Sequence, residues 1–128
     1  MKLNIPVYKI HDALAFASLY IGEGATMASE CAMLGTPAIY VNSLAAGTIE
    51  EQASYGLLLS FRSTKGVTEK TLELLKNPQL REDFQIKRNN MLSRKIDLTN
   101  FFIELLTLYC EKGLYCLINE LLKGTSKN

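Results

Sequence analysis

The fold is decided by one stretch of sequence, Leu19-Tyr-Ile-Gly-Glu-Gly-Ala-Thr-Met-Ala-Ser-Glu-Cys-Ala-Met-Leu-Gly-Thr-Pro-Ala-Ile-Tyr-Val-Asn42. A short apolar run reaches Ile21, and a turn with two glycines follows at Gly22-Glu23-Gly24. Residues 25–34 have the composition of a helix, Gly35-Thr36-Pro37 ends that helix, and a second apolar run begins at Ala38. This order predicts a βαβ unit, in which the two strands are parallel and the crossover is right-handed.

The glycine turn joins the carboxyl end of a strand to the amino end of a helix. At such a place, unpaired backbone N–H groups and the positive end of the helix dipole favour an anion such as a phosphate. A purely structural interpretation stays open beside this one. Gly22 and Gly24 then serve only a tight turn, and Thr26 serves as the helix N-cap.

The whole chain has 128 residues and a formal net charge of +1. One domain is therefore expected, and a nucleic-acid partner is not, because nucleic-acid binding needs a strong basic excess. Lys and Arg gather between residues 76 and 95 among acidic residues, which is typical of a solvated helix face. Residues 1–6 lack the apolar core of a signal peptide, and no apolar run approaches the ~20 residues of a membrane span. We expect a cytoplasmic protein with no membrane span.

Chemistry-bearing side chains are sparse. The chain has three cysteines, Cys31, Cys110 and Cys116. Because their number is odd and none has CxxC spacing, the sequence predicts neither a disulfide framework nor a zinc site. Cys31 is expected to be a small buried residue. His11, the single histidine, lies near a helix start, where a capping or surface role is more common than catalysis. We expect no catalytic residue, no metal and no cofactor.

The remaining sequence completes an α/β pattern. Strands are predicted at Ile5–Ile10, Leu19–Gly22, Pro37–Val41 and Leu57–Phe61, with helices between them. Thr48 and Thr68 are predicted to be the N-caps of two helices. The second half of the chain is predicted to be helical, and one helix there begins near Pro78 and reaches about Ile96. The fold class is α/β: a Rossmann-like parallel sheet of about four strands flanked by helices, with an all-helical C-terminal part. The domains are residues 1–112 and a helical extension with a tail, 113–128.

A family resemblance is specific over Leu19–Asn42. That stretch is similar to the C-terminal, nucleotide-binding half of GT-B-type sugar-nucleotide proteins. It most resembles a family of predicted glycosyltransferases related to UDP-N-acetylglucosamine 2-epimerase and to the N-acetylglucosaminyltransferase of lipid II synthesis. The lead-in from His11 to Ala17, the segment Glu50–Leu57 and the segment Asp97–Leu106 extend the likeness. Family members carry an additional N-terminal domain with the acceptor site.

The resemblance implies a ligand and its contacts. The diphosphate of a UDP-sugar would lie on the backbone N–H groups of the turn, and one helical carboxylate, Glu30, would accept from the ribose hydroxyls. The residues implied for the diphosphate are Gly22, Gly24, Ala25, Thr26 and Met27. Ala25 departs from the glycine of the family turn, and the Glu23 carboxylate would repel a diphosphate unless it points away. Arg62 and Lys65 follow the fourth strand and could reach the same edge of the sheet.

Two functions are therefore expected from the sequence. The first is the sugar-nucleotide-binding half of a glycosyltransferase-like protein of polysaccharide biosynthesis, truncated and inactive alone because GT-B catalysis takes place between two domains. The second is a non-catalytic interaction module that pairs with a partner subunit, or with itself, through its sheet edge and its C-terminal helices. The apolar side chains that favour pairing are Phe101, Phe102, Leu105, Leu106 and Tyr109.

Overall fold

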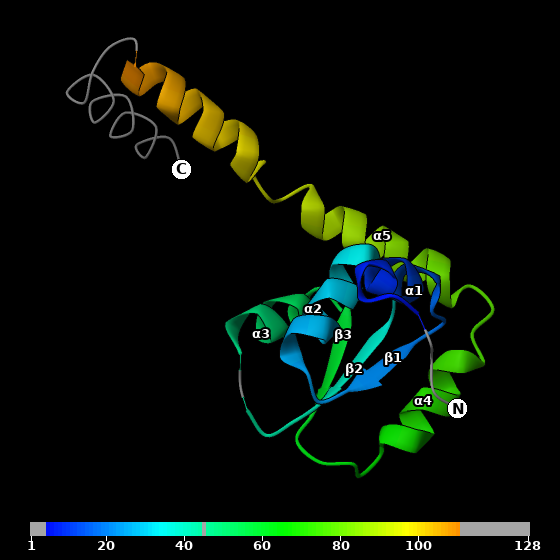
Figure 1. The fold of residues 1–128 in the computed structure, drawn as a ribbon. Coiled ribbons are helices and arrows are strands. Elements are labelled where there is room, and N and C mark those ends of the chain that lie inside the picture. Colours follow the sequence, from blue (N-terminus) through cyan, green and yellow to red (C-terminus); the bar gives the residue numbers. More distant parts are fainter. Residues whose placement is uncertain (1–4, 45, 111–128) are drawn as a thin grey trace. The chain divides into compact units, whose positions relative to one another are not determined.

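A computed structural model describes residues 5–44 and 46–110 (Figure 1). Its sheet has three parallel strands in the order β1-β2-β3: β1 (Tyr20–Gly22), β2 (Ala38–Val41) and β3 (Leu58–Phe61). In the register, Tyr20 lies opposite Ala38, and Ile39 lies opposite Leu59. The mixed α/β fold with a parallel sheet agrees with the prediction and is of the Rossmann-like kind. The predicted number of about four strands is wrong, because the described residues form a sheet of three strands.

Three helices pack on one face of this sheet: α1 (Ile10–Phe16), α2 (Ala25–Leu34) and α3 (Gly47–Ser54). The core on this face combines side chains of the helices with inward-facing side chains of the strands. Its buried members are Leu14, Ala28, Cys31, Ala38, Tyr40, Ile49 and Leu58. Because β2 is the central strand, its residues Ala38, Ile39 and Tyr40 are all buried, as is typical of a parallel strand with neighbours on both sides.

A second core forms where α5 (Leu80–Leu92) meets the carboxyl end of α2. Its buried side chains are Ala32, Leu57, Leu80, Phe84 and Met91. The sequence suggested that the basic side chains of residues 76–95 lie on a solvated helix face, but two arginines of α5 make hydrogen bonds to other helices. Arg81 Nη2 donates to the carbonyl of Ala15 over 2.8 Å, and Arg88 Nε donates to the carbonyl of Met33. Ala15 and Met33 lie in the last turns of α1 and α2, where backbone carbonyls have no partner within the helix. The two arginine side chains donate to these carbonyls, and their positive charge interacts favourably with the negative end of each helix dipole.

The predicted strand Ile5–Ile10 is wrong. The segment forms a short 3₁₀ helix, η1 (Val7–Lys9), and then enters α1 at Ile10. Pro6 has no N–H for a ladder, and its carbonyl instead accepts from the amide of Lys9 over 2.9 Å. Val7 and Tyr8 are 87% and 80% exposed. The apolar contacts of this segment come from Ile10, which packs against the first core as part of a helix.

The predicted N-caps are also wrong, while the helices themselves are confirmed. The residues at the cap positions of α2, α3 and α4 (Val67–Leu75) are Gly24, Ala46 and Gly66, and none caps with a side chain. Each helix begins one residue before its threonine, so the threonine is the second helical residue and not the N-cap. Gly66 has φ 83°, a left-handed conformation that glycine adopts without steric cost. α5 ends at Leu92, short of the predicted Ile96.

The chain divides into two compact units, Met1–Ser93 and Arg94–Asn128. The described part of the second unit is a helix over residues 98–110. Asp97 caps it, since Oδ1 accepts from the amide of Asn100 over 3.1 Å. The expected boundary at residue 112 and the expected helix over 114–122 lie outside the described residues. None of the helices in the described ranges is long and apolar enough to cross a membrane.

Candidate functional site

The turn between β1 and α2 lies at the carboxyl edge of the sheet, where parallel α/β proteins bind their ligands. Gly24 occupies the N-cap position with φ −83° and ψ 110°, and it offers no side-chain acceptor. The first helical hydrogen bond runs from the amide of Ala28 to the carbonyl of Gly24 over 3.0 Å. The three amides before it, those of residues 25–27, have no acceptor within a helix, because a helix leaves its first turn of donors unpaired.

Ala25 fits this turn without strain. It is the first residue of α2, and the described residues with positive φ are Gly35, Gly56 and Gly66, all away from the turn. The departure from glycine at position 25 therefore leaves the backbone amides where a glycine would leave them. Met27 and Thr26 are both exposed in the same helical turn.

Gly22 is needed for a different reason than backbone freedom. A Cβ at this position would overlap the hydroxyl of Tyr20 and lie 2.7 Å from its ring carbon Cζ. The Tyr20 ring therefore lies against the turn, and its hydroxyl is 3.7 Å from the place of a Cβ at Gly24. Burial and then the nearby Cys31 raise the pKa of Tyr20, against the effect of a hydrogen bond from the backbone of Gly24. Tyr20 is thus a neutral hydroxyl near pH 7, and the Gly24 amide is already engaged.

Asn42 ties this turn to the next strand. Its side-chain Nδ2 donates to the carbonyl of Glu23 over 3.2 Å, and its Oδ1 accepts from the amide of Leu44 over 3.0 Å. The Glu23 side chain is exposed. Asn42 was not predicted from sequence as a site residue. Its position directly after a buried strand at the ligand-binding edge was the signal available.

Glu30 lies on α2, and its carboxylate contacts His11. The Nε2 atom of His11 lies 3.4 Å from Oε2 of Glu30, and the two side chains are 61% and 38% exposed. His11 is a surface residue, as expected, but it does not cap α1, whose N-cap position is Lys9. Thr26 and Glu30 are four residues apart and share a face of α2. The structure thus brings Glu30 together with His11, a contact that was not predicted from sequence.

A cavity of about 130 Å³ opens at the same edge of the sheet, beyond β2 and β3. Its polar lining comes from Asn42, Ser43, Glu50, Ser60 and Arg62, and its apolar lining from Leu44, Ala46, Ile49 and Ala53. Arg62 was considered from sequence because it follows a strand. The cavity shares Asn42 with the hydrogen bond to the turn, so the two features are continuous along the edge. It combines a guanidinium, hydroxyls and an amide, which can bind the polar groups of a phosphorylated ligand, with the carboxylate of Glu50, which repels a phosphate and can accept from a hydroxyl.

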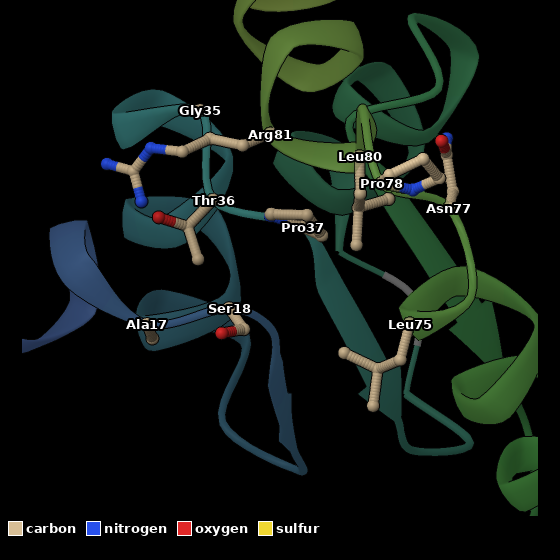
Figure 2. Close-up of a pocket in the computed structure, with 10 residues that line it drawn as sticks. All are labelled: Ala17, Ser18, Gly35, Thr36, Pro37, Leu75, Asn77, Pro78, Leu80 and Arg81. Atoms are coloured by element: carbon tan, nitrogen blue, oxygen red, sulfur yellow. The ribbon is translucent and has the colours of Figure 1, made fainter.

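A larger cavity of about 250 Å³ lies at the opposite, amino edge of the strands (Figure 2). Leu75, Pro78, Leu80 and Pro37 supply most of its apolar lining. Two of the polar side chains in its lining are used within the protein: Arg81 donates to the carbonyl of Ala15, and Asn77 Nδ2 donates to Asp83 Oδ2 over 2.8 Å. Figure 2 shows Arg81 extending along Gly35 and Thr36, away from Leu75. We therefore favour the smaller cavity, because it lies where the free backbone donors are.

The described residues hold no group of three His, Cys, Asp or Glu side chains that could bind a metal ion. Cys31 is fully buried, and burial followed by the neighbouring Glu30 raises its pKa to about 11. Its thiol is therefore protonated and unreactive at neutral pH. The site can bind and orient a ligand through backbone amides, hydroxyls and a carboxylate.

Comparisons with models of protein families, with curated protein sequences and with solved structures found no match. The fold and the turn define this chain as a mixed α/β protein with a Rossmann-like parallel sheet and a candidate anion-binding turn at its carboxyl edge.

Proposed function

We propose that this chain binds a UDP-sugar, as the donor half of a GT-B-type glycosyltransferase-like protein. The diphosphate lies on the backbone amides of Ala25, Thr26 and Met27, after the turn formed by Gly22 and Gly24. Glu30 accepts hydrogen bonds from the ribose hydroxyls.

One observation carries this proposal: α2 begins at the carboxyl edge of a parallel sheet with no side-chain cap on its first amides. Backbone donors and the helix dipole act together there on an anion. Glu30 lies four residues beyond Thr26, which is about 6 Å along the helix. That spacing suits a ligand with a phosphate at one end and a diol next to it. The cavity at Asn42 and Arg62 is adjacent space for the rest of the ligand.

In this proposal the chain binds the donor but does not catalyse sugar transfer by itself. The single histidine contacts the Glu30 carboxylate, which this proposal assigns to the ribose, and GT-B chemistry uses a second domain for the acceptor. The chain then holds the donor, and a partner that supplies the acceptor site completes the reaction. Turnover by the isolated chain is expected to be negligible.

The test is calorimetric titration of the full chain with UDP and UDP-N-acetylglucosamine. Thr26→Asp places a carboxylate in the first turn of α2 and should abolish binding by repulsion, while the helix dipole tolerates it and the protein stays folded. Thr68→Asp is the matched control, because Thr68 is also exposed and also second in a helix that lacks a side-chain cap, and it does not line the cavity at Asn42. Binding that survives Thr26→Asp, or that Thr68→Asp removes instead, would overturn the assignment.

A second function is favoured by a separate observation. In the helix over residues 98–110, Phe102 and Leu106 are 50% and 61% exposed, and Phe101 packs edge-to-face on Phe102 with ring centroids 5.8 Å apart. Exposed aromatic and aliphatic side chains at this density mark protein–protein contacts. The chain is then an interaction module that pairs with a partner subunit or as a homo-oligomer. Phe102→Glu should shift the protein to monomer in light scattering, and an unchanged mass would remove this function.

A further inference from the structure

The contact between His11 and Glu30 joins two helices at the surface. Nε2 of the imidazole lies 3.4 Å from Oε2 of the carboxylate, and the side chains are 61% and 38% exposed. The contact is therefore open to a ligand as well as to water. It also uses one of the two carboxylate oxygens and leaves Oε1 without any ion pair in the described residues.

The two helices do not depend on this contact for their packing. Leu14 of α1 lies in the same buried core as Ala28 and Cys31 of α2. In addition, the Thr36 hydroxyl donates to the carbonyl of Leu14 over 2.9 Å, and this bond is buried. Exposed ion pairs add little to stability in comparison with such contacts. The main effect of His11 is thus on the conformation of the Glu30 side chain.

We propose that His11 is a positioning residue for Glu30 in ribose recognition. This inference rests on the proposed function. A free glutamate samples several rotamers, and ordering it on ligand binding reduces affinity. An imidazole N–H that donates to Oε2 orders the carboxylate beforehand, so that Oε1 faces the adjacent hydroxyls of the ribose. His11 acts through Glu30 and does not itself need to touch the ligand.

The readout for this role is discrimination between ribose and deoxyribose. A carboxylate that accepts from the 2′-hydroxyl makes UDP bind about tenfold more tightly than 2′-deoxy-UDP, since a hydrogen bond to a charged group is worth that much. His11→Leu should reduce this preference several-fold and should lower the affinity for 2′-deoxy-UDP less than the affinity for UDP. His11→Gln should restore it, because the glutamine amide can donate from a similar position. Asp12→Asn, the neighbouring exposed position on α1, is the control and should keep the preference.

The experiment is a calorimetric titration of the full chain and these three variants with both nucleotides, with a thermal unfolding curve for each protein. If the wild-type chain binds neither nucleotide, the proposed function fails and this inference fails with it. If the wild-type chain prefers UDP and His11→Leu keeps that preference, only the role of His11 is overturned. An equal loss of affinity for both nucleotides in a folded His11→Leu protein also overturns it, because that result indicates a general structural effect.

Discussion

The side-chain amide of Asn42, at the end of β2, donates a hydrogen bond of 3.2 Å to the backbone carbonyl of Glu23, in the turn that follows β1. The bond links the carboxyl ends of two neighbouring parallel strands. Because the turn leads directly into α2, its position fixes where the first amides of that helix point. Asn42 therefore connects the candidate phosphate site to the cavity beside it.

Replacing Asn42 by alanine should weaken UDP binding several-fold and lower the free energy of unfolding by about 1 kcal/mol. The loss of affinity is expected because the turn would no longer be held against β2. Calorimetry measures the first effect and urea denaturation the second.

Asn77→Ala is a closely matched control. Asn77 also accepts from the amide two residues ahead, that of Gln79 over 2.9 Å, and also donates through Nδ2, to Asp83. It lines the amino-edge cavity, at the opposite edge of the sheet from the turn. A similar loss of UDP affinity in both variants would show that Asn42 acts through general stability and not through the turn.

Gly22→Ala should destabilise the protein by about 1–3 kcal/mol, because the new methyl group overlaps the Tyr20 side chain and one of the two must move. Gly47→Ala is the control, since a Cβ at Gly47 meets nothing within 4 Å and alanine favours the helix there. Adding Tyr20→Leu to Gly22→Ala should recover part of the loss, as the shorter side chain leaves the space free. A double variant no more stable than Gly22→Ala would contradict this account of Gly22.

The parallel arrangement of β1 and β2 could be predicted from sequence, because the signals for a βαβ unit are local. The glycine turn and the stop at Gly35-Thr36-Pro37 lie next to the elements they delimit, and Gly35 indeed ends α2 in a left-handed conformation with φ 74°. The strand predicted at Ile5–Ile10 was wrong, because a strand forms only beside a neighbouring strand and the local sequence does not show whether one is present. Its apolar residues were equally compatible with the turn and helix that the structure has.

The site could be predicted only in part for the same reason. The turn and Glu30 lie within one continuous stretch, so their proximity follows from the helix period. The contact of His11 with Glu30 depends on how α1 packs on α2, and that of Asn42 with Glu23 depends on strand pairing. Both are tertiary contacts, and each residue type is common enough on a surface to give no signal by itself.

Ser29→Ala should lower the free energy of unfolding by about 1 kcal/mol, because the buried Gln52 amide loses its hydrogen bond of 2.8 Å to the Ser29 hydroxyl and keeps only the longer one of 3.4 Å to the Ser29 carbonyl. Gln52 of α3 is only 5% exposed, and its Nε2 donates to the Ser29 hydroxyl over 2.8 Å, while its Oε1 has no hydrogen-bond partner among the residues that the structure describes. Combining Ser29→Ala with Gln52→Leu removes both polar partners and should recover most of that loss. Urea denaturation of the single and double variants checks this, and simple additivity of the two changes would argue against the pairing.

The stability of the protein should fall between about pH 9 and pH 11, and Cys31 should cause part of that fall. Burial raises the pKa of this thiol from 9.0 to about 11 in the folded protein. In the unfolded chain the thiol loses its proton first, so the folded state binds more protons in this window and becomes less stable as pH rises. Below pH 9 the contribution is fully present. Cys31→Ala should be less stable than the wild type below pH 9, because a buried sulfur is lost, and its stability should decline less steeply above pH 9, so that the two curves approach each other. The pKa of Tyr20 is shifted in the same direction, so part of the slope should remain in that variant. Urea denaturation at a series of pH values measures both curves, and parallel curves across this window would rule out Cys31 as a source of the pH dependence.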